Sequence, residues 1–451
     1  MKNFTKQLLK YIPGGSHTYS RGFDQFPSNA PAILSKAKDA YVYDQNGKKF
    51  LDYGMGLRSV NIGYNNKIIS RAAIKEIFKG NNLTLPSVTE LKAAKLFTNI
   101  IETADMVKFA KNGSTAVTAA VKLARAYTGK EIVLRCSDHP FFSYDDWFIS
   151  STPITKGIPK NVLKNIKNFN YKSINKLNYL IKKYKNNIAA LILEPATTEC
   201  PYILPNNIEC CGKFNCKYKK NDNFLKIVEN ICKKNKIIFI LDEMITGFRW
   251  SLYGAQKIYS VKPDLSTFGK AMANGFSISA LCGKRKIMKL GSIEDKGKER
   301  VFLVSTTFGS EMMSLGAFIE TIKFIKKNNV IKKNWIYGQK LKDTFNKLAD
   351  KYNISEMVSM KGPSCSPYYV CKDMNKNISL SYKTLFMQEM IKNGVLFTPY
   401  ISISYSHGSK ELKMTEKALS NTMLIYKKAL KFGIKRYLKG DSIKPVFRKY
   451  N

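Results

Sequence analysis

Two neighbouring stretches decide the fold of this chain: an apolar run that ends in an acidic residue, and a glycine-flanked lysine that follows it. They read IIFILDEMITGFR (residues 237–249) and PDLSTFGKAMANG (residues 263–275). A continuous apolar run of this length is typical of a buried parallel strand. Asp242 then stands just past the predicted strand, at the edge where open α/β sheets bind their ligands. Lys270 follows in a turn of small residues. Most lysines are solvated surface groups, so Lys270 is a candidate functional residue only because of the motifs that accompany it.

Helical patterns alternate with short apolar runs from about residue 65 onward. The expected elements are helices at 116–127 and 222–234 and strands at 131–136, 188–193 and 237–241. This alternation predicts an α/β fold, doubly wound around a mostly parallel central sheet. Glu194, like Asp242, lies one residue past a predicted strand.

The two ends of the chain differ from its middle in the secondary structure that their sequence predicts. The start combines turn residues with short strand-like runs. The part beyond about residue 312 combines lysine-rich helices, the last of them expected at 416–431, with strand candidates at 363–370 and 394–397. We therefore expect an N-terminal segment (1–64), a large cofactor-binding α/β domain (65–311) and a smaller C-terminal α+β domain (312–451) that also receives the N-terminal segment.

Composition indicates a folded, intracellular protein. The 451 residues are 44% hydrophobic and include 25 Tyr and 26 Phe, which excludes a disordered chain. The N-terminus lacks the apolar stretch of a signal peptide, and no apolar run approaches the length of a membrane span. The nine cysteines are odd in number and irregularly spaced. We expect reduced thiols, a cytoplasmic location and no membrane partner.

The formal net charge of +42 raises the question of nucleic-acid binding. However, the lysines are spread along the whole chain among Asn and Ile, and there is no arginine-rich tract or nucleic-acid-binding motif. Solvated lysine faces explain the charge better, so we expect no specific nucleic-acid partner.

A candidate phosphate site precedes the first helix of the middle region, in the run KNGSTA (residues 111–116). A glycine lets the backbone approach a phosphate, a hydroxyl can donate to it, and a helix N-terminus attracts anions. An ordinary N-cap would also use these residues. Together with a carboxylate (Asp242) that can hold a pyridinium nitrogen and an amine (Lys270) that can form a Schiff base, the run predicts pyridoxal 5'-phosphate as cofactor.

Several motifs occur in the order of a known family. They are IPGG (12–15) with Arg21, AYVYD (40–44), LDY (51–53), NGS (112–114), EP (194–195), DEM (242–244), Lys270 and STTFG (305–309). With them, the chain resembles the class III (fold type I) pyridoxal phosphate aminotransferases over essentially its whole length. Within that family it is most similar to the glutamate-1-semialdehyde 2,1-aminomutases. The resemblance implies fold type I, with its large domain and a smaller domain built from both chain ends.

The resemblance also implies roles for individual residues. Lys270 would bind the cofactor as a Schiff base and move the proton, and Asp242 would keep the pyridine nitrogen protonated. The remaining cofactor contacts would come from Met244 and Phe141 on the ring, from Asn112, Gly113 and Ser114 on the phosphate, and from Thr307 of the neighbouring subunit. Shared sites of this kind imply a homodimer.

The residues expected to bind the substrate match the family less closely than the residues expected to bind the cofactor. Arg21 is similar to the arginine that binds the substrate carboxylate in the aminomutases, with Arg58 and Arg249 as alternatives. The family's tryptophan after the first strand pair is replaced near Leu57-Arg58, the Phe-Glu segment at the site entrance appears as Thr398-Pro399, and a glycine run after Lys270 is lost.

We therefore expect an enzyme that transfers amino groups, in one of two forms. An aminomutase would move the group within one substrate, whereas a transaminase would pass it to a keto compound or sugar. A more remote alternative is an inactive, basic nucleic-acid-binding or scaffold protein, which the intact Lys270 and Asp242 argue against.

One insertion carries four cysteines at residues 200, 210, 211 and 216. A zinc site needs two pairs at chelating spacing, or histidine partners, and this segment offers only Cys211 and Cys216. A variable surface loop is the better interpretation, and we expect no metal.

Overall fold

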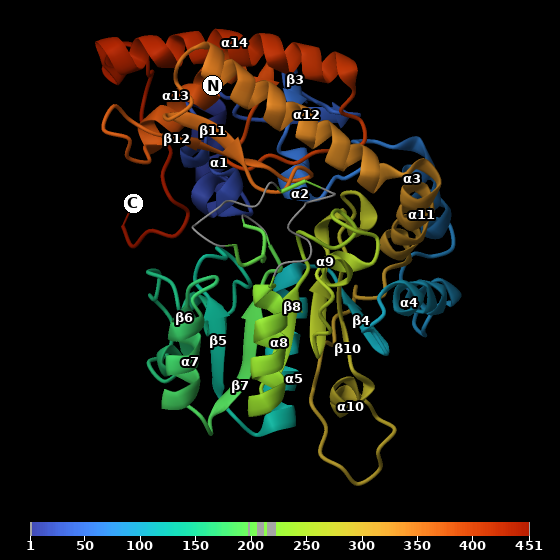
Figure 1. Cartoon of the computed structure of the whole chain (residues 1–451). Helices are drawn as coiled ribbons and strands as arrows, with labels where there is room; N and C mark the ends of the chain where they lie inside the picture. Colours follow the sequence, from blue (N-terminus) through green and yellow to red (C-terminus); the bar gives the residue numbers. More distant parts are fainter. Residues whose placement is uncertain (1, 197–198, 205–211, 214–221, 451) are drawn as a thin grey trace. The chain divides into compact units, whose positions relative to one another are not determined.

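A computed structural model describes residues 2–196, 199–204, 212–213 and 222–450 of the chain (Figure 1). The chain divides into two compact units. Unit 1 combines residues 1–66, 211–214 and 332–448, and unit 2 combines residues 67–210, 215–331 and 449–451. Residues 312–331, expected in the C-terminal domain, group with unit 2 in this division.

Unit 2 is built around a seven-stranded sheet with the order β4-β10-β9-β8-β7-β5-β6. Its strands are β4 (Met106–Ala110), β5 (Ile132–Cys136), β6 (Ile166–Phe169), β7 (Ile188–Leu193), β8 (Ile238–Asp242), β9 (Leu265–Phe268) and β10 (Ser279–Gly283). Only β10 runs antiparallel to its neighbours, so the other six strands share one direction. The predicted mostly parallel sheet is confirmed.

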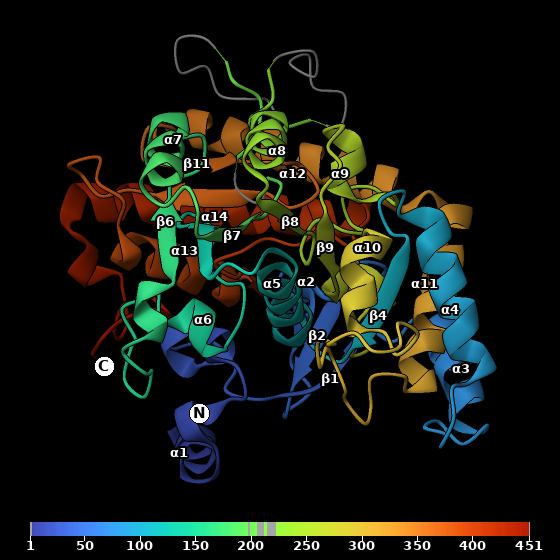
Figure 2. The ribbon, with the colours of Figure 1, turned by 90° about the horizontal axis from the view of Figure 1, so that it is seen from below.

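Helices cover both faces of this sheet. The helices of unit 2 are α3 (Lys67–Ile77), α4 (Val88–Ile100), α5 (Gly113–Thr128), α6 (Asp146–Ile149), α7 (Ile174–Lys183), α8 (Phe224–Asn235), α9 (Gly254–Ile258), α10 (Arg285–Met288) and α11 (Met312–Asn328). Helices α7 and α8 lie on one face and α5 on the other (Figures 1 and 2). Strands β5, β7 and β8 are buried along their whole length, which explains the apolar sequence of β7 and that of β8 up to Asp242.

Helix α5 is the element that orients the candidate phosphate residues. Its N-cap is Asn112, whose side-chain oxygen accepts a hydrogen bond from the Thr115 amide. It ends at Gly129, whose φ of 66° is a left-handed conformation that glycine adopts without strain. The alanines on its buried face pack against the sheet. These caps fix the start of the helix directly after β4.

Unit 1 contains two smaller sheets. The first has the order β1-β2-β3-β13 and the second pairs β11 with β12. The strands are β1 (Leu34–Lys38), β2 (Tyr41–Asp44), β3 (Lys49–Asp52), β11 (Val358–Lys361), β12 (Tyr368–Cys371) and β13 (Val395–Leu396). The last strand joins β3 in parallel, so segments more than 340 residues apart in the sequence share one sheet.

The helices of unit 1 complete its core. They are α1 (Lys2–Tyr11), the turn α2 (Met55–Arg58), α12 (Val330–Lys351), α13 (Leu380–Lys392) and α14 (Ser409–Phe432). One hydrophobic cluster gathers side chains from the N-terminal strands and from α12, α13 and α14. The expected helix at 416–431 is thus the C-terminal part of a longer helix. No helix among the described residues is long and apolar enough to cross a membrane.

Candidate functional site

Three parallel strands of unit 2 bring the predicted residues to one edge of the sheet. Strand β4 leads into Asn112 and helix α5, β8 ends at Asp242, and β9 leads into Lys270. Because these strands share a direction, their carboxyl ends lie at the same edge, which is where ligands bind in this architecture. The candidate site is therefore assembled from segments that span about 160 residues of sequence.

Asp242 is a buried carboxylate with defined partners. It is 2% exposed, and its Oδ1 accepts hydrogen bonds from the Met244 amide (2.9 Å) and the Thr267 hydroxyl (3.0 Å). Burial raises the pKa of Asp242 to about 6, although the Met244 amide, Lys270 and Thr267 act in the opposite direction. The carboxyl is thus poised to gain a cationic partner, which would favour its ionised form.

Lys270 begins a short 3-10 turn, η7 (Lys270–Ala273), directly after β9. Its backbone φ is 42°, a left-handed conformation that is uncommon for a residue with a side chain. Strained backbone of this kind clusters at functional sites. Its positive charge also lowers the pKa of Asp242, so the two groups are in electrostatic contact.

The N-terminus of α5 offers donors for an anion. Asn112 uses its side chain as the N-cap, while its carbonyl oxygen accepts a hydrogen bond from the Ser279 hydroxyl (2.7 Å). The amides of Gly113 and Ser114 open the helix, where no carbonyl one turn earlier can accept them. A helix start with such amides and a positive dipole end is a ready-made anion site.

Met244 lies between the helix start and the lysine turn. A Cβ added at Gly113 would lie 2.9 Å from the Met244 sulfur, and one added at Gly269 would lie 2.6 Å from it. Both distances are too short for real atoms, so glycine is required at both positions as long as Met244 stays in place. The methionine therefore joins Asp242, the helix start and the lysine turn into one packed group.

The loop after β5 contains Phe141, the predicted ring-stacking residue. Phe141 is 48% exposed, whereas its neighbour Phe142 is 2% exposed and packs against Phe148. His139 is also buried, and its Nδ1 accepts a hydrogen bond from the Glu194 amide (3.0 Å). Burial lowers the pKa of His139 to about 3, so this histidine is neutral and holds the ends of two strands together.

Thr307 lies in an exposed turn of unit 2. The start of the next helix is tied to the phosphate loop, because Glu311 forms an ion pair with Lys111, the residue before Asn112. Lys111 also donates to the Ser314 hydroxyl (3.0 Å). The segment that carries Thr307 is therefore fixed to the loop that carries Asn112, Gly113 and Ser114.

The three candidate arginines differ in their surroundings. Arg21 is exposed and ends the 3-10 turn η2 (Tyr19–Arg21) of unit 1. Arg58, also in unit 1, is buried with its guanidinium 4.9 Å from the Tyr400 ring centre, and Arg249 is fully buried in unit 2. Of the three, only Arg21 is openly accessible to a substrate from solvent.

Arg58 ends a left-handed turn that the sequence analysis did not anticipate. Residues 55–58 all have positive φ, between 43° and 69°. The Asp52 carboxylate holds the start of this turn by accepting hydrogen bonds from the Gly54 amide (2.7 Å) and the Met55 amide (2.9 Å). A left-handed turn costs about 1–2 kcal/mol per non-glycine residue. The turn occupies the segment where the family's tryptophan is replaced.

Sequence analysis missed other residues that support the site. Thr267 bonds Asp242, with which it pairs in register across β8 and β9. The parallel pairing of two adjacent strands was a usable signal, because it places residues near the strand ends side by side. The hydroxyls of Ser277 and Ser279, which bond the carbonyls of Lys111 and Asn112, gave no such signal.

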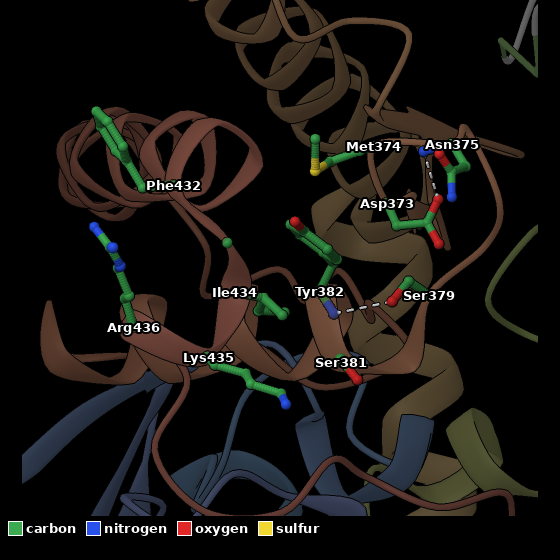
Figure 3. A pocket seen from close by; sticks show the side chains of 11 residues that line it. Asp373, Met374, Asn375, Ser379, Ser381, Tyr382, Phe432, Ile434, Lys435 and Arg436 are labelled. Carbon is green, nitrogen blue, oxygen red and sulfur yellow. Dashed lines mark hydrogen bonds between the residues drawn. The ribbon is translucent and has the colours of Figure 1, made fainter.

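A separate pocket lies in unit 1, with a volume of about 590 Å³ (Figure 3). It is lined by residues around the start of α13 and the end of α14, including Tyr382, Phe432, Lys435 and Arg436. Lys435 and Arg436 are exposed, and the pocket holds none of the predicted site residues. We do not assign the reaction to it.

The cysteine insertion gives no metal site within the described part of the chain. Cys200 is buried, whereas Cys210, Cys211 and Cys216 lie outside the described residues. Elsewhere in the described ranges, no three metal-binding side chains gather.

The groups at this sheet edge are suited to binding one kind of ligand. The helix start can hold a phosphate, Asp242 can hold a protonated ring nitrogen, and Lys270 supplies a primary amine near that carboxylate. An aromatic phosphate ester with a ring nitrogen and a carbonyl group would satisfy all three.

Sequence comparisons identify similar proteins over nearly the whole chain. The profile of the family described as Aminotransferase class-III matches residues 24–404. The glutamate-1-semialdehyde 2,1-aminomutase of Methanococcus maripaludis is 30% identical over 444 residues, covering 94% of this chain and 97% of the relative. The 3-aminobutyryl-CoA aminotransferase of Cloacimonas acidaminovorans is 29% identical over 428 residues, with coverage of 94% and 97%.

Solved structures share the fold. The FumI protein of Sphingopyxis, in its PLP internal aldimine form, has a TM-score of 0.82 and 23% identity, covering 96% of this chain and 97% of that chain. An omega-transaminase from Sphaerobacter thermophilus has a TM-score of 0.79 and 19% identity, with coverage of 94% and 97%. The predicted fold class is thereby confirmed.

Proposed function

Because this chain belongs to the class III aminotransferase family, it is an enzyme that uses pyridoxal 5'-phosphate, and we propose that it is a glutamate-1-semialdehyde 2,1-aminomutase-like enzyme. The observation that carries the proposal is the convergence of Asp242, Lys270 and the start of α5 at one sheet edge of unit 2. We also propose a cytoplasmic location, which is supported by the free thiols of Cys136, Cys200, Cys232, Cys282 and Cys371.

The residues at the sheet edge fit the cofactor. The phosphate would be held by the amides at the start of α5 and by the hydroxyl of Ser114, with Asn112 and Gly113 shaping the loop. Asp242 would accept the proton-bearing ring nitrogen, whose positive charge would offset the burial that raises the carboxyl pKa. Met244 would pack on one face of the ring and Phe141 on the other, where its exposed ring leaves room.

When bound, the cofactor supplies an electron sink that stabilises negative charge at the carbon next to the substrate nitrogen. Lys270 would attach the cofactor through Nζ and, once released by the substrate amine, accept a proton from one substrate carbon and return it to another atom. Asp242 would stay ionised throughout, because only the ionised carboxylate keeps the ring nitrogen protonated. Thr267 and the Met244 amide would hold that carboxylate in place.

We propose a homodimer in which Thr307 reaches the phosphate of the neighbouring subunit. Large apolar side chains are exposed along α3, the start of α4 and the turn between them, including Phe78, Leu85 and Val88. Phe302 and Phe308, near Thr307, are also exposed. Clusters of this kind on a single chain are typical of subunit interfaces.

Mixing two variants tests whether subunits share sites. We expect Thr307→Ala to weaken cofactor binding about tenfold, the effect of losing a hydrogen bond to a charged group. Mixed dimers of Thr307→Ala and Lys270→Ala chains would each contain one site with both residues intact. Activity of the mixture should therefore exceed that of either variant alone. No gain, although mass spectrometry shows mixed dimers, would mean that each site is built from one chain.

The aminomutase proposal rests on the similarity to curated aminomutases and on an accessible Arg21. Its test is a turnover assay with 15N-labelled glutamate 1-semialdehyde in the presence of unlabelled amino acids. An aminomutase retains the label while the amino group moves from carbon 2 to carbon 1. Dilution of the label by the added amino acids would instead identify a transaminase.

An intermolecular transaminase is the second candidate, and a specific observation favours it. The changed positions near Leu57-Arg58 and Thr398-Pro399 lie in the segments that face the substrate in the family, and Arg58 ends a left-handed turn there. A 3-aminobutyryl-CoA aminotransferase is as similar to this chain as the aminomutases are. A keto compound or sugar would then be the acceptor.

Arg21 decides between carboxylated and neutral substrates. We expect Arg21→Lys to raise KM for a carboxylated substrate about tenfold, because lysine cannot reproduce the two-pronged contact of a guanidinium. Half-reactions with uncharged amines should barely change. Arg436→Lys is a matched control, since Arg436 is exposed and also ends a 3-10 turn, η9 (Ile434–Arg436). Equal effects on charged and uncharged amines would make Arg21 a structural residue.

A further inference from the structure

A hydrogen-bonded cluster joins the loop after β5 to the first two turns of α5. It consists of Thr118 on α5, of Ser143 and Asp145 on the loop, and of Trp147 in the short helix α6 that follows the loop. The Trp147 indole donates to the Thr118 hydroxyl (2.9 Å), and that hydroxyl donates in turn to the Asp145 carboxylate. Ser143 donates to the same carboxylate oxygen (3.1 Å) and accepts from the Asp145 amide (3.1 Å).

The cluster is partly enclosed. Ser143 is fully buried and Trp147 is 5% exposed, whereas Thr118 and Asp145 are half-buried, so the hydrogen bonds are partly shielded from competing water. Asp145 also accepts, through its carbonyl oxygen, hydrogen bonds from the amides of Phe148 and Ile149 in α6. The loop is therefore held at its end by the turn into α6, while its side-chain bonds with Thr118 hold it against α5.

The same loop reaches the phosphate residue directly. The Tyr144 amide, which lies between Ser143 and Asp145 in sequence, donates to the Ser114 hydroxyl oxygen (3.2 Å). Ser114 and Thr118 are four residues apart on α5 and therefore occupy the same helix face. The loop thus contacts the helix at two successive turns, once through Thr118 and once through Ser114.

This contact sets the direction of the Ser114 hydroxyl. A hydroxyl has one proton to donate and two lone pairs to accept with. The Tyr144 amide occupies a lone pair, so the hydroxyl proton must point elsewhere and remains available to a phosphate oxygen at the helix start. A hydroxyl oriented in advance loses less freedom when the phosphate binds.

We propose that Thr118, with Asp145 and Trp147, is a positioning residue for phosphate recognition: it holds the Tyr144 amide against Ser114 so that the Ser114 hydroxyl donates to the cofactor phosphate. The inference rests on the proposed cofactor site and adds to it the residues that hold the Tyr144 amide against Ser114. None of the three side chains needs to touch the cofactor itself.

The test is equilibrium binding to the full-length apoenzyme, measured by titration calorimetry with two probes. Pyridoxal 5'-phosphate carries the phosphate, whereas pyridoxal has the same ring without it. We expect Thr118→Val to weaken binding of pyridoxal 5'-phosphate about fivefold to twentyfold, because an oriented hydrogen bond to a charged group is lost. Binding of pyridoxal should change less than twofold. Inorganic phosphate should also compete less well in the variant.

Three further variants make the result specific. Thr118→Ser keeps the hydroxyl and should restore wild-type affinity. Thr128→Val is the matched control, because Thr128 lies at the far end of α5, where its hydroxyl bonds the carbonyls of Ala124 and Arg125 and the amide of Lys130. Trp147→Phe keeps most of the packing while removing the indole donor, and it should lower affinity for the phosphate probe alone if Thr118→Val does not fold.

The outcomes separate this inference from the proposed function. Equal weakening for both probes, or no weakening for either, overturns the positioning role while leaving the cofactor site intact. If the wild-type chain itself bound neither probe, the proposed site would be wrong.

Discussion

Replacing Lys270 with alanine is expected to lower turnover by on the order of 10⁴-fold, since in the proposed function this one side chain both attaches the cofactor and moves the proton. Alanine removes the amine but leaves the backbone at the same left-handed φ, so the fold should survive. Borohydride reduction followed by peptide mass spectrometry would label Lys270 in the wild type. In the variant, no lysine should carry the reduced cofactor.

Two control variants distinguish the loss of the reactive amine from the loss of its positive charge. Lys270→Arg keeps the positive charge that lowers the Asp242 pKa, but a guanidinium cannot form the Schiff base, so turnover should remain absent. Lys257→Ala removes an exposed lysine that forms an ion pair with Glu102, and this variant should behave as wild type. Wild-type turnover by Lys270→Ala would refute the catalytic role of this lysine.

Asp242→Asn should retain the cofactor yet slow proton removal from the substrate by about 10²–10³-fold, the usual effect of losing one preorganised charge. The amide keeps the shape of the carboxylate, and its oxygen can still accept from Thr267 and the Met244 amide. It cannot stabilise a protonated ring nitrogen. The rate can be followed by exchange of the substrate proton with deuterated solvent, and an unchanged rate would contradict the assignment.

The same variant should also change how cofactor affinity depends on pH. Burial raises the Asp242 pKa from 3.8 to about 6, so below that pH the apoenzyme carboxyl is largely protonated and must lose its proton to hold the ring nitrogen. Wild-type affinity should therefore fall by up to about tenfold for each pH unit below 6, relative to Asp242→Asn. Parallel pH profiles for the two proteins would show that Asp242 does not face the ring.

Long apolar runs made the central elements predictable. The strand expected at 188–193 has the same bounds as β7, and the strand expected at 237–241 is β8 shifted by one residue. A buried parallel strand needs apolar side chains on both faces, so its sequence carries a local signal. The helix after residue 112 was predictable for the same reason, since its cap and its apolar spacing are both local.

Other features depend on contacts between distant segments. Only the folded chain shows that Met244 fills the space beside both Gly113 and Gly269. The same holds for His139, which is buried and neutral and links the ends of two strands by a hydrogen bond. The left-handed turn at residues 55–58 was also not predicted, because only Gly56 in it favours positive φ. The Asp52 carboxylate, which bonds the amides at its start, supplies the missing stabilisation.

The sequence by itself determined the α/β fold and the family and predicted the residues of the candidate cofactor site, because each depends on short motifs and on their order along the chain. Tertiary structure alone decided which side chains support them. Thr267 meets Asp242 through the pairing of β8 with β9, and the segment 143–147, which leads into α6, meets Ser114 and Thr118 on α5. Hydroxyl contacts of this kind leave no periodic pattern in a sequence, since they arise only where two separately folded segments pack together.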